Sequence, residues 1–287
     1  MRNAFFVFAL SVAVAIVAVS VIAGKRAQSN GPCTADSTRV VLSAVPEASG
    51  VAVSRRTPGL LWSMNDSGEP RLVAFDASGA MKARVRVTGA TTDDWEDLAS
   101  APCRQGSCLY IADIGDNRTS RRTITLYRVP EPRTDDQATA PAEAFTAAYP
   151  DGAHDAEALF LDSSGRAYIV TKAKSKETAL YRWPQLRAGA TGMLERLTSL
   201  PLEHVTGADA SADGTWVALR TNDQLYFYRM RELLASSGGQ PLRVNLAGLK
   251  EPQGEGVAFG AAGRVYLAGE GGGRGGTLVS LKCALPQ

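Results

Sequence analysis

Short apolar runs of five to seven residues recur along the chain after residue 30, separated by Gly, Asp, Asn, Ser and Pro. Such runs between turn-forming residues are typical of short antiparallel strands. Five of the runs align on an aromatic residue, and successive aromatics are 48, 58, 48 and 50 residues apart. The aligned residues are Trp62, Tyr110, Tyr168, Trp216 and Tyr266. This pattern predicts five repeats of one supersecondary unit.

Each repeat holds further strand candidates on either side of the aromatic run. A first strand precedes it at 47–51, 94–98, 155–159, 206–210 and 253–257, and a third follows it at 72–75, 126–129, 180–183, 225–228 and 278–281. A fourth, weaker strand is expected in the first four repeats, near 83–87, 144–148, 194–200 and 242–246. Four strands in about 50 residues make one propeller blade. The sequence therefore predicts an all-β fold, a five-bladed β-propeller.

The two ends of the repeat region complement each other. The fifth repeat stops at Gln287 without a fourth strand, whereas one unassigned strand, 38–43, precedes the first repeat. In a closed ring this N-terminal strand can complete the last blade. Cys33 would then precede the added strand and Cys283 would end its neighbour, so we predict a Cys33–Cys283 disulfide that locks the ring.

The N-terminal segment has a different character. Residues 4–23 contain no charge and are flanked by Arg2, Lys25 and Arg26. This length is enough to span a bilayer, but the small residues at 21–23 also suit a signal-peptide cleavage site. We therefore expect a signal peptide or a transmembrane anchor at 1–27, a short linker at 28–37 and the propeller at 38–287.

The cysteines indicate the cellular location, and the charge balance limits the classes of partner. Cys103 and Cys108 flank a turn-like stretch, and an even count of four cysteines favours two disulfides and an extracytoplasmic location, secreted, periplasmic or anchored. Beyond residue 26 the chain carries 28 basic and 29 acidic residues, a balance that argues against nucleic-acid binding. We expect a monomer whose only membrane contact is the N-terminal segment.

Acidic residues coincide at the start of the first strands, which line the channel of a propeller. Because side chains two apart point the same way, two columns result, one with Ser49, Glu96, Glu157, Ala208 and Glu255, the other with Glu47, Asp94, Asp155, Thr206 and Gln253. Crowded carboxylates raise one another's pKa or require a cation, and oxygen-only ligands suit Ca²⁺. We predict an axial calcium held by Ser49, Glu96, Glu157 and Glu255. The alternative is that these acids pair with bases at the rim or cap turns.

The second strands return to the same face and bring further polar residues to it. The expected substrate-binding residues, suited to a small anionic ligand such as a phosphate, are Lys172, Arg220, Arg118, Asn65 and Asp66. The catalytic candidates are Asp113 or Asp155, which would orient a water, and His154, which would act as acid or base. Ordinary solvated loops are the alternative interpretation.

Several segments resemble a known group of proteins. They are Glu-Ala-Ser-Gly-Val at 47–51, Leu-Trp-Ser-Met-Asn-Asp-Ser-Gly at 61–68, and the W-E-D-L, D-A-E-A-L and G-E-G-V-A-F elements. They resemble secreted β-propellers of the phytase-like and esterase-like groups. The blade count and the column that starts at Ser49 also resemble the calcium-activated nucleotidases (apyrases). The resemblance implies calcium-dependent hydrolysis of phosphate esters or anhydrides, but it departs at Ala208, where a ligating side chain is expected.

Two main functions remain open from the sequence, beside an untested activity such as that of a sugar lactonase. One is a calcium-dependent hydrolase of phosphate esters or anhydrides, or a related esterase. The other is a non-catalytic propeller that binds a ligand or a protein and carries a structural calcium. Because propellers serve both purposes, the fold does not decide between them.

Overall fold

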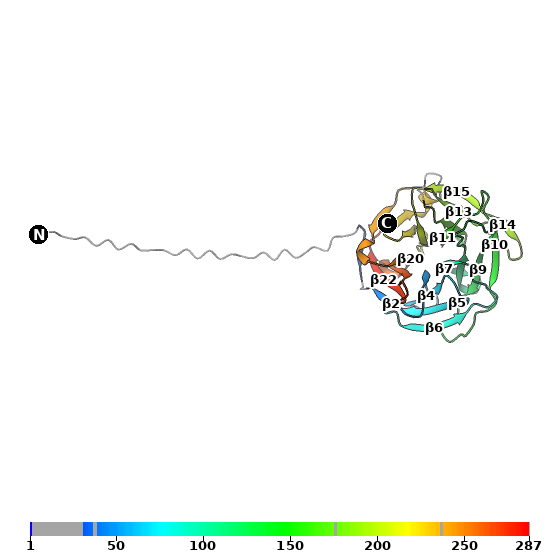
Figure 1. Cartoon of the computed structure of the whole chain (residues 1–287), viewed down its shortest axis with the longest axis horizontal. Helices are drawn as coiled ribbons and strands as arrows, with labels where there is room; N and C mark the ends of the chain where they lie inside the picture. The colour runs from blue at the N-terminus through cyan, green and yellow to red at the C-terminus, as the bar shows by residue number, and fades with distance from the viewer. Residues whose placement is uncertain (2–30, 37–38, 175–176, 236–237, 287) are drawn as a thin grey trace.

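The computed structural model describes residues 1, 31–36, 39–174, 177–235 and 238–286, and it has the predicted fold. Five antiparallel blades surround a central channel (Figure 1). The expected signal peptide or anchor at 1–27 lies outside the described residues, apart from Met1. Among the residues described, no helix has the length and apolar character needed to cross a membrane.

The first four blades follow one another along the chain. Blade one consists of β3 (Ala48–Val53), β4 (Leu60–Asn65), β5 (Arg71–Asp76) and β6 (Met81–Arg86). Blade two consists of β7 (Trp95–Cys103), β8 (Gly106–Asp113), β9 (Ile124–Pro130) and β10 (Glu143–Ala148), with β14 (Thr191–Met193) added parallel to β10. Blade three consists of β11 (Ala156–Leu161), β12 (Ala167–Thr171), β13 (Thr178–Arg182) and β15 (Glu195–Leu200). Blade four consists of β16 (Val205–Ala210), β17 (Trp216–Thr221), β18 (Gln224–Arg229) and β19 (Leu242–Asn245).

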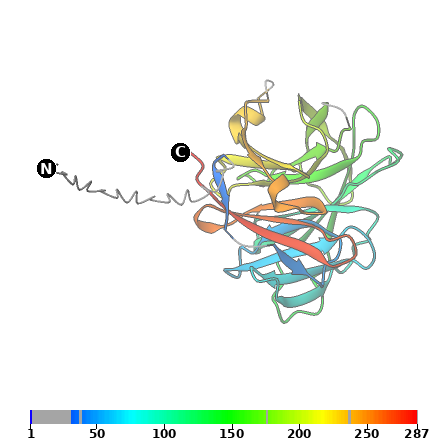
Figure 2. The same cartoon turned by 60° about the vertical axis from the view of Figure 1, so that its left-hand side comes forward.

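The fifth blade closes the ring with strands from both ends of the chain. β20 (Gln253–Phe259), β21 (Arg264–Glu270) and β22 (Gly276–Cys283) are joined by β1 (Cys33–Ala35) and β2 (Val40–Leu42), both antiparallel to β22 (Figure 2). Cys33 lies opposite Cys283 and forms the predicted disulfide. The closure is confirmed, and part of the segment expected to be a linker contributes strand β1. The short helices are α1 (Met230–Leu233), η1 (Ala247–Leu249) and η2 (Ala261–Gly263).

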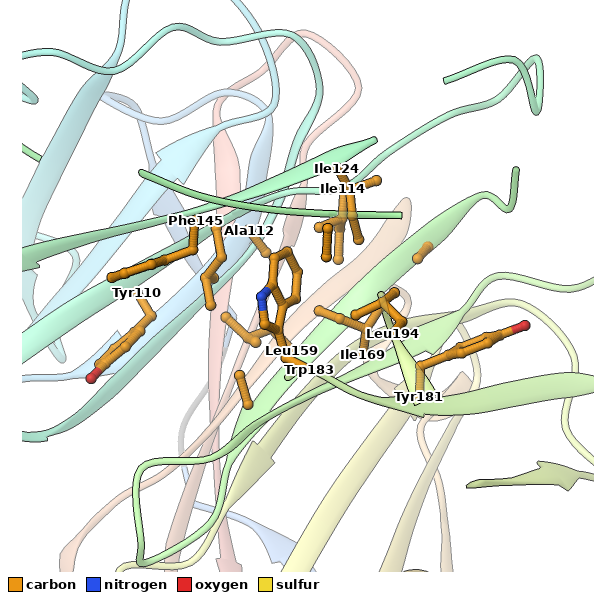
Figure 3. Packing of buried hydrophobic residues seen from close by; sticks show 14 of the residues in the cluster. Tyr110, Ala112, Ile114, Ile124, Phe145, Leu159, Ile169, Tyr181, Trp183 and Leu194 are labelled. Carbon is orange, nitrogen blue, oxygen red and sulfur yellow. The ribbon is translucent and has the colours of Figure 1, made fainter. Parts of the chain in front are cut away.

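Buried apolar side chains form five clusters, each between two neighbouring blades. Because successive residues of a strand point to opposite faces, each blade contributes one face to each of its two neighbours. The cluster between blades two and three includes Phe145 and Trp183, which come from different blades (Figure 3). The five aromatics that defined the repeat are all buried, with at most 9% of their surface exposed.

The inner strands approach one another closely around the axis, and glycines make this possible. A Cβ atom on Gly50 would lie 2.5 Å from the backbone nitrogen of Leu98, and one on Gly256 would lie 2.7 Å from that of Val51. A Cβ on Gly207 would lie 2.5 Å from the carbonyl oxygen of Glu255. Real Cβ atoms do not come so close, so these positions require glycine.

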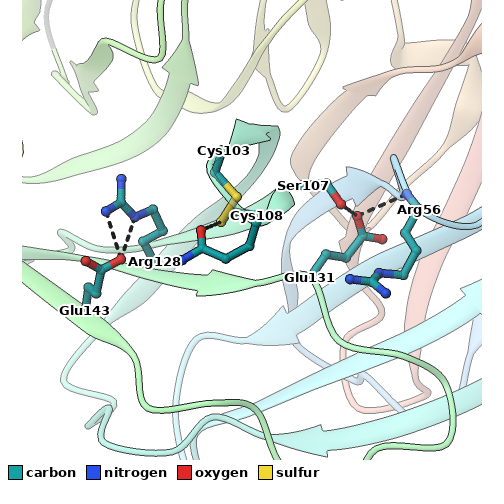
Figure 4. Close-up of a disulfide and its surroundings, with 8 residues drawn as sticks. Arg56, Cys103, Ser107, Cys108, Arg128, Glu131 and Glu143 are labelled. Carbon is teal, nitrogen blue, oxygen red and sulfur yellow. Dashed lines mark hydrogen bonds and ion pairs between the residues drawn. A yellow bond between two sulfur atoms is a disulfide. The ribbon is translucent and has the colours of Figure 1, made fainter.

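The two faces of the ring are defined here by the inner strands: the acidic face is where they begin, and the far face is where they end. The second predicted disulfide, Cys103–Cys108, closes the β7–β8 turn at the far face (Figure 4). Nearby, buried Glu131 accepts hydrogen bonds from the Ser107 hydroxyl at 2.7 Å, the Trp62 indole at 3.1 Å and the Arg56 backbone at 3.2 Å. These contacts join blades one and two at the far face.

Candidate active site

Each inner strand carries a β-bulge at the same place, near the acidic face. The register of pairing with the second strand shifts at this point in all five blades. A bulge re-aims the side chain of the extra residue. The side chains at the bulges are all buried, and they belong to Ser49, Glu96, Glu157, Thr206 and Glu255.

The bulge corrects the alignment of blade four. The column expected from the sequence placed Ala208 beside the glutamates, but Thr206 occupies that position and Ala208 lies two residues further along β16. The Thr206 hydroxyl donates a 2.8 Å hydrogen bond to the carbonyl oxygen of Gly254 in the next blade. The same shift places His204 in the column of Asp94 and Asp155.

Lys172 reaches the glutamates of the bulge column. It follows the end of β12, and its ammonium group forms an ion pair with Glu157. Burial opposes the charge of Lys172, but attraction by Glu157, Glu255 and Glu96 outweighs it and raises the lysine pKa. The other carboxylate oxygen of Glu157, Oε2, is buried without a hydrogen-bond partner among the described residues.

The three glutamates hold protons more tightly than free glutamates do. Burial, followed by repulsion from Glu255, raises the pKa of Glu157 to about 8. Burial is also the main cause that raises the pKa of Glu255 to about 7 and that of Glu96 well above its ordinary value. Glu157 and Glu255 can therefore exchange protons near neutral pH.

Further acids surround this centre, and together they form what we call the acidic mouth: Glu47, Asp66, Asp94, Glu96, Asp155, Glu157, Glu255 and Glu270. Repulsion from Asp66 raises the pKa of Glu47, while burial raises those of Asp94 and Glu270. Gly115 leaves room for this crowding, since a Cβ there would overlap the carboxylates of Asp94 and Glu96. Asn65 lies at the edge, where its side-chain oxygen accepts the Glu47 backbone N–H at 3.2 Å.

Asp113 is buried behind this site and has internal partners. It pairs with Arg121 at 2.9 Å and accepts backbone hydrogen bonds from Asp93 at 3.1 Å and Asp94 at 3.2 Å. Asp155 similarly accepts the backbone N–H of Asp116 at 2.9 Å. Both aspartates among the catalytic candidates thus hold loops in place, although Asp155 also belongs to the acidic mouth.

The three basic side chains that were expected to bind phosphate together, Lys172, Arg220 and Arg118, do not lie at one site. Only Lys172 contacts the acidic mouth. Arg220 is fully buried between blades four and five, where it pairs with Glu251 at 2.5 Å and donates to the carbonyl oxygen of Ala268 at 2.6 Å. Arg118 is exposed on the loop after β8. His154 lies in a separate cluster, with its Nε2 atom 3.0 Å from both Asp151 and the Tyr181 hydroxyl.

Two aspartates of the inner strands, buried Asp97 and half-buried Asp209, were missed by the sequence reasoning. Asp97 is fully buried and accepts backbone hydrogen bonds from Leu98 and Leu159 at 2.8 Å and from Ala208 at 3.0 Å. Asp209 accepts the Ala210 N–H at 2.8 Å and that of Phe259 at 2.7 Å. Both link the inner strands of different blades. The only sequence signal was an acid at a position where an inner strand should be apolar.

The donor set does not fit the expected calcium. Within the described parts of the chain, no group of three or more His, Cys, Asp and Glu side chains is placed to hold a metal ion. The ammonium of Lys172 already provides a positive charge to Glu96, Glu157 and Glu255. Calcium binding therefore stays a prediction.

Comparison with known proteins confirms the fold. No family model and no curated protein matches the chain. Among solved structures, it is similar to the PQQ-bound aldose sugar dehydrogenase of Streptomyces coelicolor, with a TM-score of 0.54 and 11% identity over 88% of this chain and 98% of that one. It is also similar to the soluble aldose sugar dehydrogenase of Escherichia coli in its apo form, with a TM-score of 0.52 and 11% identity over 86% and 99% of the two chains. A gluconolactonase of Xanthomonas campestris has a TM-score of 0.45 and 16% identity over 78% and 69%. At these identities the likeness shows the propeller fold alone, and the phytase-like or apyrase-like resemblance stays a prediction.

Proposed function

We propose that the acidic mouth is the active site of a hydrolase that acts on an uncharged, hydroxyl-rich ester or lactone. The observation that carries the proposal is the ion pair of buried Glu157 with the partly exposed Lys172, close to Glu96 and Glu255. It combines one cation with carboxyl groups whose pKa values lie near neutrality, about 8 for Glu157 and about 7 for Glu255.

The residues have separate roles in this proposal. Glu255, in its ionised form, takes a proton from the water that attacks the acyl carbon. Lys172 stabilises the negative charge that develops on the carbonyl oxygen, and Glu157 holds the lysine in position. The alkoxide leaving group then takes up the proton, which completes the hydrolysis.

The charge of the site favours an uncharged substrate. Eight carboxyl groups gather at the acidic mouth, while Arg121 is paired with Asp113 and Arg220 with Glu251. Carboxylates accept hydrogen bonds from hydroxyl groups, whereas they repel a phosphate. Sugar-acting enzymes among the fold neighbours are compatible with this substrate class, but the proposal rests on the site.

A panel of sugar lactones and aryl esters, followed by acid release at pH 7.5, tests the proposal. We expect Glu255→Gln and Lys172→Met to lower kcat at least a hundredfold, because each removes one catalytic group. Glu203→Gln, an exposed glutamate before β16, is the matched control and should keep full activity. Hydrolysis that survives both active-site substitutions would contradict the assignment.

A calcium-dependent phosphate-ester hydrolase is the second candidate, in line with the resemblance noted in the sequence. It is motivated by the Oε2 atom of buried Glu157, which has no hydrogen-bond partner among the described residues and could accept a cation. Phosphate release from nucleotides that requires added Ca²⁺ would support this candidate. Absence of turnover on every substrate class would instead favour a non-catalytic binding propeller.

We also propose that the protein works outside the cytoplasm. Two disulfides, Cys33–Cys283 and Cys103–Cys108, support this location because such bonds persist in oxidising compartments. Localisation of the full-length chain by cell fractionation tests it.

A further inference from the structure

A large pocket opens on the far face, across the ring from the acidic mouth. Its volume is about 890 Å³, within the range of small-molecule sites. It runs from the end of the channel outward between blades four and five. We call it the far-face pocket; its walls include Arg55, Asp209, Trp216, Arg229, Phe259 and Leu285.

One wall of the far-face pocket is apolar and aromatic. Trp216 is held by Arg229, whose guanidinium carbon lies 4.2 Å from the centre of the indole ring. Arg229 also donates a 3.0 Å hydrogen bond to the carbonyl oxygen of Pro286, which fixes the chain end against the pocket. Phe259 and Leu285 extend the apolar surface. This wall suits a flat or aliphatic ligand body.

The opposite wall presents a positive charge from Arg55. Buried Glu131 accepts the Arg55 backbone N–H at 3.2 Å, and the Arg55 Nε atom donates to the carbonyl oxygen of Ser100 at 3.0 Å. Among the described residues, no side chain pairs with the two terminal nitrogens of this guanidinium. These two contacts therefore hold the backbone and the Nε atom of Arg55 in place, and its two terminal nitrogens remain available to donate hydrogen bonds to a ligand.

The acids near the pocket offset this charge only in part. Both oxygens of Asp209 accept backbone N–H groups, and burial raises its pKa to about 7, although the charge of Arg55 acts in the opposite direction. Asp213 accepts hydrogen bonds from the Ser211 hydroxyl and the Thr215 backbone within its own turn. Arg264, a further cation of the lining, is itself paired with Asp36 at 2.9 Å.

We infer that the far-face pocket binds an organic anion with an apolar body, and that Arg55 holds its acidic group. This site is separate from the acidic mouth and does not depend on the function proposed there. The two ends of the channel then select opposite ligand chemistries.

Two probes with the same body test the inference. They are 8-anilinonaphthalene-1-sulfonate, which carries an acidic group, and N-phenyl-1-naphthylamine, which does not; both report binding by fluorescence. We expect the sulfonate to bind wild-type protein at least tenfold more tightly than the amine. Arg55→Gln should remove most of this difference and leave the affinity for the amine unchanged.

The controls separate the pocket from other surfaces. Arg122→Gln, an exposed arginine of the acidic face, should leave both affinities unchanged. Ala261→Trp, at an exposed position of the pocket wall, should fill the pocket and weaken both probes at least tenfold. Equal affinity of the two probes for wild-type protein, unchanged affinity for the sulfonate in Arg55→Gln, or unchanged affinity for both probes in Ala261→Trp would overturn the inference. Circular dichroism verifies that each variant is folded.

Discussion

At the scale of single residues, the channel is held together by carboxylates that accept backbone N–H groups. The inner edge of each blade presents unpaired N–H groups to the axis, and buried donors without acceptors are costly. The Asp97 carboxylate accepts hydrogen bonds from the backbone N–H groups of Leu98, Leu159 and Ala208, which belong to blades two, three and four. One side chain thus links three blades at the axis.

Asp97→Asn should destabilise the protein by about 3 kcal/mol or more. The amide has one acceptor oxygen and directs its NH₂ group at backbone donors, and each unsatisfied buried donor costs about 1–3 kcal/mol. Urea unfolding measures the loss. Asp223→Asn, at an exposed position in the β17–β18 turn, should change the unfolding free energy by less than about 0.5 kcal/mol. Similar midpoints for both variants would show that Asp97 is not a structural link.

The raised carboxyl pKa values predict that stability falls as pH rises from about 4.5 to about 8. Unfolded Glu and Asp titrate near 4, whereas in the folded protein the pKa is about 8 for Glu157 and about 7 for Glu255 and Asp209. Because the folded protein binds these protons more tightly than the unfolded chain does, the three groups stabilise the fold below their unfolded pKa. This stabilisation is lost as the pH rises through the folded pKa. Acids with a lowered pKa, such as Asp76, change the stability only below about pH 4, outside the range from about 4.5 to about 8.

Thermal unfolding followed over this pH range tests whether stability falls as the pH rises. Glu255→Gln should flatten the decline, because the amide does not ionise, while Glu203→Gln should leave its slope unchanged. A melting temperature that rises between pH 5 and pH 8 would contradict the assignment of raised pKa values.

At the scale of elements, the narrow ring depends on glycines in the inner strands. Gly256→Ala should destabilise by about 1–3 kcal/mol, because its Cβ would lie 2.7 Å from the backbone nitrogen of Val51 in the next blade. Gly248→Ala, in the short helix η1, is the matched control since no atom lies within 4 Å of its Cβ position. Chemical denaturation compares the two, and an equal effect would show that the inner strands can separate.

The elements also show where sequence reasoning succeeded and where it failed. The aromatic column identified the second strand of every blade, since these buried residues recur at one register. Blade four was aligned two residues out of register because Thr206-Gly-Ala-Asp-Ala matches the acidic pattern of the other blades as well as His204-Val-Thr-Gly-Ala does. A bulge at each inner strand decided the register, and bulges leave no reliable mark in a sequence.

At the scale of the whole molecule, the sequence revealed the closed ring but only part of the site. Strand order and closure follow from repeats and from the complementary chain ends. The partners of long charged side chains do not follow from the sequence, because they depend on how each side chain turns in the folded protein: Lys172 pairs with Glu157 of its own blade, while Arg220 is buried against Glu251. The far-face pocket was missed because its walls combine the strand ends of several blades with turns and with residues 284–286, a combination that no single repeat predicts.

Ring closure predicts the effect of losing the Cys33–Cys283 disulfide. The bond joins residues 250 apart, so it constrains the unfolded chain strongly, and its loss should cost about 2–5 kcal/mol. Because β1 and β2 still pair with β22, Cys33→Ser should fold, with a lower urea midpoint. The Cys33→Ser/Cys283→Ser double variant should match the single one, since both lack the same bond. Cys103→Ser/Cys108→Ser removes a bond between residues only five apart and should cost less. If removal of the short-range bond cost as much, restriction of the unfolded chain would not be the source of the stability.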